Sequence, residues 1–156
     1  RGRILLEMIE QLKRYHALYN ALWRETNAIY EEWAKQRGWS YCELLVILSL
    51  VENQDTCKQK DICQLWQLPK QTVNTILKKF LVHRWVELAP CKEDHRNKVI
   101  HLTITGKETF EAVASALQHC EEIVWERLGK DRADTLIENT KRYNQFFREA
   151  GIDENT

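Results

Sequence analysis

Several features that would place this chain in a membrane or outside the cell are missing. No apolar run approaches the roughly 20 residues that a membrane span needs. The N-terminal residues do not show the pattern of a secretory signal peptide. The five cysteines are an odd number without regular spacing, which does not favour a disulfide framework. We therefore expect a cytoplasmic protein with no membrane partner.

The chemistry of enzymes and metal sites is equally scarce. The sequence has no glycine-rich phosphate loop, no G-x-S-x-G motif and no recognisable Asp/His/nucleophile set, so we predict no enzyme, no catalytic residue and no cofactor. It also has no C-x-x-C or H-x-x-x-H pair. The polar run His119–Glu122 is spread around a helix by its spacing and is better interpreted as a solvated face than as a metal site.

Charge is balanced in number but not in distribution. The chain has 23 Lys and Arg against 23 Asp and Glu. Segment 58–98 holds nine basic and four acidic residues, or +5, which leaves 14 basic and 19 acidic residues, or −5, elsewhere. A basic middle within an acidic frame indicates a localised site for a polyanion, with a solvated charged face as the alternative.

The terminal regions are predicted to be long helices. Segment 3–37 has no Gly or Pro before Gly38, and its apolar residues form two stripes rather than one. One stripe can pack on the molecule itself, and the second suggests a partner. A long helix over 105–129, capped by Thr105, and a last helix over 131–150 are also expected.

The middle of the chain, 40–104, carries shorter elements. Ser40 and Glu43 form the pattern of a capping box at the start of a very apolar helix. Two further helices meet at a brief turn that ends in Pro69, which is typical of a helix-turn-helix. Two strand-like runs flank the polar segment 92–97, which predicts a β-hairpin.

This order of elements resembles the MarR family of bacterial winged helix-turn-helix transcriptional regulators. The residues that carry the resemblance are KQTVNTILKKFLVHRWVEL (70–88) and EDHRNKVIHLTITGKE (93–108). Within them stand Asp94-x-Arg96 in the hairpin and Leu102-Thr103-x-x-Gly106 after it. The resemblance implies one MarR-type domain over 1–156, mainly α-helical with a small β-hairpin wing. Helices 3–37 and 131–150 would dimerise, and 105–129 would connect them to the winged part.

The resemblance also implies a bacterial homodimer that binds a pseudo-palindromic operator in double-stranded DNA. Asp94 would support the wing, and Arg96 would enter the minor groove. Polar side chains of these types bind bases and phosphates. The predicted DNA-binding residues are Lys70, Gln71, Thr72, Asn74, Thr75, Lys78, Lys79, Arg96 and Lys98.

Regulation is expected from the same resemblance, which implies a repressor released by a small-molecule or oxidant signal. Cys42, near the start of its helix, is a candidate redox sensor, with a buried inert cysteine as the alternative. A metal-responsive regulator and a winged-helix module that binds protein rather than DNA remain open. Aromatic side chains that could bind a small aromatic effector, or simply form core, are His16, Tyr19, Trp23, Trp39, Tyr41 and Trp66.

Overall fold

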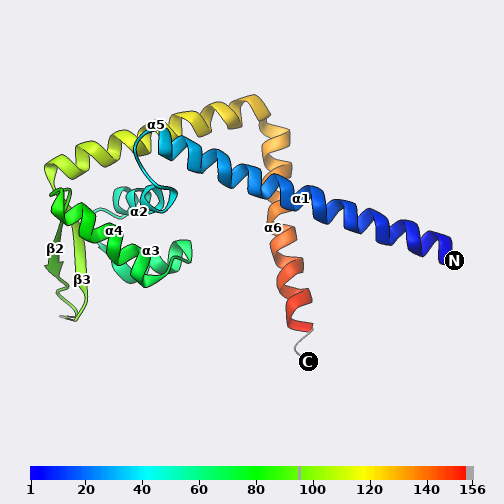
Figure 1. The fold of residues 1–156 in the computed structure, drawn as a ribbon, viewed down its shortest axis with the longest axis horizontal. Coiled ribbons are helices and arrows are strands. Elements are labelled where there is room, and N and C mark those ends of the chain that lie inside the picture. The colour runs from blue at the N-terminus through cyan, green and yellow to red at the C-terminus, as the bar shows by residue number, and fades with distance from the viewer. Residues whose placement is uncertain (95, 154–156) are drawn as a thin grey trace. The chain divides into compact units, whose positions relative to one another are not determined.

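The structure is a computed structural model that describes residues 1–94 and 96–153, and Figure 1 shows its ribbon. Its contacts divide the chain into two compact units, Arg1–Phe110 and Glu111–Thr156. The expected single domain over 1–156 includes residues 95 and 154–156, which lie outside the described residues. The elements are α1 Gly2–Gln36, α2 Tyr41–Glu52, β1 Cys57–Lys58, α3 Gln59–Trp66, α4 Lys70–Val82, β2 Val86–Pro90, β3 Lys98–Leu102, α5 Ile104–Leu128 and α6 Lys130–Asp153.

The long helices agree closely with the sequence prediction. Helix α1 has 35 residues and Ala34 is its buried residue, so most of its apolar side chains are exposed. Leu12 and Leu22, for example, are both 59% exposed. Helix α6 brackets the predicted range 131–150 and also exposes large apolar side chains. Among the described residues, none of the helices combines the length and hydropathy that a membrane span requires.

Helix α2 forms the centre of the first unit. The predicted capping box is present: the Glu43 amide donates to Ser40 Oγ (3.0 Å), and the Ser40 amide donates to Glu43 Oε1 (2.9 Å). These bonds satisfy two amides that the first helical turn leaves without partners. Leu44 and Ile47 are fully buried, because the helix is apolar on nearly every side.

Helices α3 and α4 form the helix-turn-helix. Gln67 ends α3 in the left-handed region with φ of 53°, and its amide donates to the Cys63 carbonyl. Pro69 then stands just before α4, where its missing amide costs no helical hydrogen bond. Val73 and Leu77 bury one face of α4, and the opposite face is polar and exposed.

The hairpin is confirmed, but the sheet has three strands rather than two. The strand order is β1-β3-β2, and both pairs are antiparallel. In the register, Cys57 and Leu88 both face Ile100 on the central strand. The two-residue β1 escaped prediction because it has no alternation of its own and exists only through pairing with β3.

An aromatic cluster in the first unit joins the segment before α2, helix α4 with the segment after it, and the start of α5. The Trp39, Phe80, Trp85 and Phe110 ring centroids lie 4.9–6.1 Å apart, mostly in edge-to-face geometry. The half-buried Trp39 therefore helps to pack this unit, and its role in binding an effector stays a prediction.

The predicted cap of α5 was wrong by two residues. The helix starts at Ile104, and the hydroxyl of Thr103 rather than Thr105 accepts from the amide of Gly106 (3.0 Å). The Thr103 hydroxyl also donates to the Arg84 carbonyl (2.7 Å), and the Thr103 amide donates to the Trp85 carbonyl (3.1 Å). Thr103 thus fastens the end of the hairpin to the end of α4.

Candidate nucleic-acid interface

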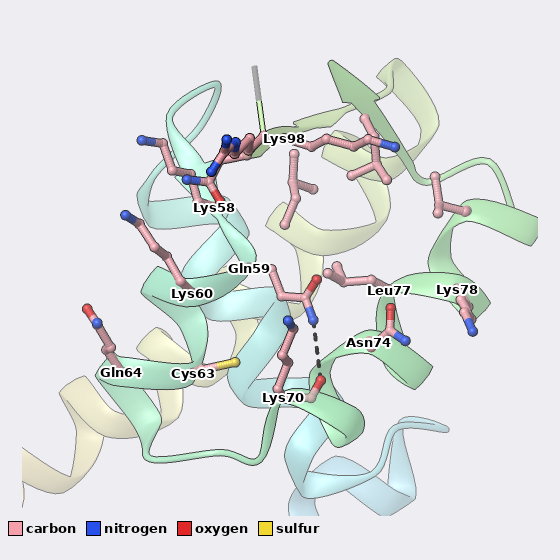
Figure 2. A pocket seen from close by; sticks show the side chains of 15 residues that line it. Lys58, Gln59, Lys60, Cys63, Gln64, Lys70, Asn74, Leu77, Lys78 and Lys98 are labelled. Carbon is pink, nitrogen blue, oxygen red and sulfur yellow. Dashed lines mark hydrogen bonds between the residues drawn. The ribbon is translucent and has the colours of Figure 1, made fainter. Parts of the chain in front are cut away.

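Helix α4 presents its polar face beside the hairpin. Asn74 and Lys78 are four residues apart, so they lie one turn above each other on the same face. Both line a concavity of about 500 Å³ between α3, α4 and the sheet, which Figure 2 shows from close by. Among the lining residues, the Gln59 side-chain amide donates to the Lys70 carbonyl (3.3 Å) and connects α3 to the start of α4.

The concavity is strongly basic. Its described lining residues include six cations and no carboxylate, which gives one sign of charge to a recess rather than to a flat surface. Such a recess concentrates the positive potential that attracts a polyanion. The cationic lining residues are Lys58, Lys60, Lys70, Lys78, Arg96 and Lys98.

Asp94 organises the turn of the hairpin. Its Oδ1 accepts from the backbone amide of Arg96 (3.0 Å), and its Oδ2 accepts from the Asn97 side-chain amide (3.0 Å). The Asn97 amide also donates to the Asp94 carbonyl (3.1 Å). In these bonds Asp94 holds the backbone of Arg96 rather than its guanidinium group. The exposed Arg96 side chain extends from a fixed turn and lines the concavity.

Cys91 stands at the base of this turn. Amides of Glu93 and Asp94 hydrogen-bond its sulfur and hold the pKa of the thiol below its usual value, although burial opposes them. Its own amide donates to the Asn97 carbonyl (3.0 Å), which closes the hairpin. Cys91 therefore belongs to the scaffold that fixes Asp94 and Arg96.

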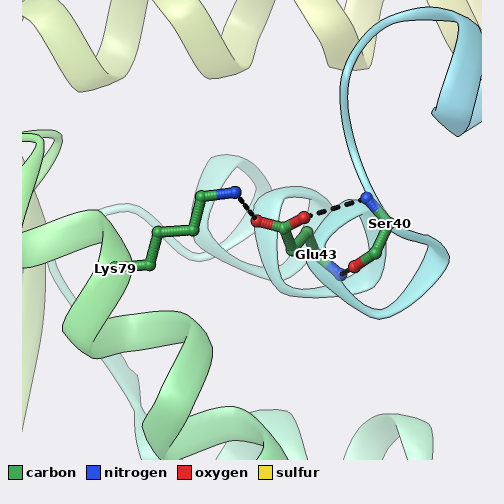
Figure 3. Close-up of polar contacts among 3 residues, drawn as sticks. All are labelled: Ser40, Glu43 and Lys79. Carbon is green, nitrogen blue, oxygen red and sulfur yellow. Dashed lines mark hydrogen bonds and ion pairs between the residues drawn. The ribbon is translucent and has the colours of Figure 1, made fainter.

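Lys79 has a different position from the other predicted DNA-binding residues. Its Nζ lies 2.6 Å from Glu43 Oε2 on α2 (Figure 3), so its charge is already paired with a carboxylate of the protein, although the Lys79 side chain is 45% exposed. Burial raises the pKa of Glu43, but hydrogen bonds from Lys79 and Ser40, together with the Lys79 charge, outweigh it. The net result is a pKa below the ordinary 4.5.

The remaining predicted DNA-binding residues lie on or near the exposed face of α4. Gln71, Asn74 and Thr75 are exposed, and Thr72 is half-buried. The Thr75 hydroxyl donates to the Gln71 carbonyl (2.9 Å), which leaves its lone pairs for a donor. Of the predicted set, the concavity brings together Lys70, Asn74, Lys78, Arg96 and Lys98.

Strand β1 and helix α3 contribute residues that were not predicted from the sequence to belong to the site. Lys58, Lys60 and Gln64 line the same concavity, as Figure 2 shows. Their signal was present in the basic count over 58–98, since a helix-turn-helix places its first helix beside the second. Without the fold, however, nothing separated these lysines from an ordinary solvated face.

The predicted effector-binding residues have separate surroundings. His16 contacts Asn20 on the same helix (3.1 Å), and the Trp66 indole donates to the Ser49 hydroxyl (2.7 Å). Tyr41 lies beside Tyr30, with ring centroids 6.4 Å apart. Tyr19 and Trp23, which belong to the same predicted set, are 42% and 61% exposed on α1.

The redox and metal hypotheses gain little from the geometry. Cys42 is half-buried at the second residue of α2, as expected, and its thiol is free. Burial, aided by the charge of Asp61, raises the pKa of Cys57 to about 11 and makes that thiol inert. Within the part of the chain that the structure describes, no three His, Cys, Asp or Glu side chains gather as metal ligands.

A helix-turn-helix whose second helix stands beside a β-hairpin defines the winged helix-turn-helix class. Within that class, residues 43–97 match the family model described as MarR family, and the expected resemblance of this chain to MarR family regulators is confirmed in sequence and in fold.

Solved structures similar to this chain cover most of it. NMB1585, a MarR family regulator from Neisseria meningitidis, is 25% identical with a TM-score of 0.72, covering 94% of this chain and 99% of its own. Reduced AbfR bound to DNA is 25% identical with a TM-score of 0.63, covering 88% and 96%. MepR of S. aureus in complex with DNA is 20% identical with a TM-score of 0.69, covering 85% and 97%. No curated protein sequence matches the chain.

Proposed function

We propose that this protein is a sequence-specific regulator of transcription that binds double-stranded DNA, rather than an enzyme. The observation that carries the proposal is the basic concavity between α3, α4 and the hairpin, with six cations and no carboxylate among its described lining residues. The similarity to AbfR and MepR, both solved in complexes with DNA, supports the same function.

The two sides of the concavity have complementary tasks in this proposal. Helix α4 enters the major groove, where Asn74 can hydrogen-bond an adenine edge and the nearby lysines contact phosphates or guanine. Arg96 reaches the minor groove, whose negative potential favours a permanently charged guanidinium. Asp94 keeps the hairpin turn closed and so fixes the point from which Arg96 extends.

We also propose that the protein acts as a homodimer. Large apolar side chains on α1 and α6 are exposed to an extent that monomeric soluble proteins rarely show. A second copy of the same chain would cover them and would place two recognition helices on one duplex. Two-fold symmetry then requires a pseudo-palindromic operator with half-sites about one helical turn, roughly 10 bp, apart.

Regulation is the finer part of the proposal: a repressor in the bacterial cytoplasm that a small molecule or an oxidant releases from DNA. One similar structure is the reduced form of AbfR bound to DNA, which supports an oxidant signal, with Cys42 as the candidate thiol. If Cys42→Ser abolishes peroxide-induced release, the redox route stands. If peroxide releases neither the wild-type protein nor the Cys42→Ser variant from DNA, the signal is a small molecule or a metal.

Selection of bound sequences from random duplex DNA tests the proposed function directly. The expected result is a pseudo-palindromic consensus, and a footprint of the best sequence should cover both half-sites. Enrichment of no sequence, together with binding that ignores salt, would instead support a winged-helix module for a protein partner.

A further inference from the structure

Lys79 and Glu43 form an internal link between two helices that the DNA-binding role does not explain. The 2.6 Å ion pair joins α4 to the first turn of α2 across 36 residues of sequence. Glu43 is itself held at its other oxygen by the Ser40 amide (2.9 Å), as Figure 3 shows. Its carboxylate is therefore a fixed anchor rather than a mobile surface group.

A second contact fixes Lys79 at the same place. Its Nζ lies 5.8 Å from the centroid of the Trp39 ring, within the range of a cation–π interaction. The next residue, Phe80, packs against the same indole at 6.1 Å. Two consecutive residues of α4 are thus attached to the corner that leads into α2.

The direction of Lys79 on α4 separates it from the DNA-binding face. Successive residues of an α-helix point about 100° apart. Lys78 lines the basic concavity, whereas Lys79 points to α2 and is not among the lining residues described. The lysine that lines the concavity and the lysine that pairs with Glu43 are therefore adjacent in sequence but point in different directions.

We propose that Lys79 is a positioning residue for DNA recognition: paired with Glu43, it sets the placement of α4 over the duplex without contacting DNA. The inference rests on the proposed DNA-binding function and deepens it. It also replaces the prediction from sequence that Lys79 binds DNA directly.

The two roles predict different effects for the two partners. If Lys79 contacts phosphate, Lys79→Met lowers both the affinity for duplex DNA and the number of counterions released on binding. Glu43→Gln then raises the affinity, because it frees the Lys79 charge for DNA. If Lys79 positions α4, removing either partner lowers affinity, although Glu43→Gln takes a negative charge away from a DNA-binding protein. Lys79→Met should be more disruptive than Glu43→Gln, because it leaves the buried Glu43 carboxylate without its cation.

The experiment is a salt titration of duplex affinity for the full chain and four variants. We expect Glu43→Gln to lower affinity about tenfold and Lys79→Met to lower it further, with the slope of log affinity against log salt unchanged in both variants. Lys79→Arg, which keeps the ion pair, should restore most of the affinity. The matched control, Lys78→Met, should reduce the magnitude of the slope by about one for each lost phosphate contact.

Two results of the titration would overturn the positioning role. One is a smaller magnitude of the salt slope in Lys79→Met, and the other is binding by Glu43→Gln that is as tight as wild type or tighter. Hydrogen exchange measured without DNA distinguishes failure of the positioning role from failure of the proposed DNA-binding function. The backbone amides of residues 70–82 should exchange faster in Glu43→Gln than in wild type. In Lys79→Arg and in Lys78→Met, the same amides should exchange at the wild-type rate. Unchanged exchange in Glu43→Gln overturns the inference whatever the protein binds. Absence of duplex binding by wild type overturns the proposed function whatever the exchange shows.

Discussion

Gly106 is the glycine at which a single added methyl group should damage the fold most. A Cβ atom at this residue would lie 1.8 Å from the Trp85 carbonyl oxygen and 2.6 Å from its carbonyl carbon. Both neighbours are backbone atoms, so no side-chain rotation can relieve the clash. To reach an ordinary contact of 3.4 Å from 1.8 Å, the two segments must separate by 1.6 Å.

That separation acts on the bonds through which Thr103 fastens the hairpin to α4 and α5. Three hydrogen bonds are at stake: Thr103 to the Arg84 and Trp85 carbonyls, and the Gly106 amide to the Thr103 hydroxyl. At about 1 kcal/mol each they represent about 3 kcal/mol. Overpacking costs at least about 1 kcal/mol more. We therefore expect Gly106→Ala to lower the free energy of unfolding by about 4 kcal/mol, a large part of the usual 5–15 kcal/mol.

Urea denaturation followed by circular dichroism measures this loss, and Gly2→Ala is the matched control. A Cβ at Gly2 meets nothing within 4 Å, so the control should change stability by about 0.5 kcal/mol or less. A loss below about 1 kcal/mol in Gly106→Ala would refute the reasoning, because it would mean that the α5 start shifts without breaking the Thr103 bonds.

Three other predictions concern the hairpin and the capping box. Arg96→Ala should weaken duplex binding at least about tenfold with an unchanged melting temperature, since the side chain is exposed; equal affinity in a salt-controlled titration would exclude it from the interface. Asp94→Ala should also weaken binding, although it removes a negative charge, because the hairpin turn loses two hydrogen bonds. Glu93→Ala is its charge-matched control, and equal behaviour of the two variants would contradict a role for the turn. The lowered pKa of Glu43 stabilises the fold above pH 4.5, and this contribution is lost as the pH falls through the lowered value. Wild type should therefore exceed Glu43→Gln in stability at pH 7 and lose this advantage in acid; a pH-independent difference would contradict the linkage.

Local patterns predicted much of this fold, because the physics that forms them is local. The Ser40–Glu43 capping box lies within one helical turn, and its two bonds follow from residue type and spacing. The hairpin and the long helices were visible for the same reason, in the period of their apolar residues and in the turn residues between them.

Features that depend on distant parts of the chain were not predictable in the same way. The sequence of α4 alone does not show that Lys79 has a carboxylate partner, because Glu43 lies 36 residues earlier and meets Lys79 only through the packing of α4 on α2. Lys58 and Lys60 belong to the concavity because tertiary packing brings β1 and α3 beside α4 and the hairpin, which local patterns do not encode. The cap at Thr103 was missed because its hydroxyl is fixed by carbonyls at the end of α4, about 19 residues earlier in the chain.

The salt dependence of duplex binding tests the central claim most directly. Titration of a selected duplex at several salt concentrations by fluorescence anisotropy gives the slope of log affinity against log salt. Six cations in each basic concavity predict a steep linear fall, with a slope of about −0.9 for each phosphate neutralised. An affinity that stays flat as salt rises would contradict DNA binding by this surface.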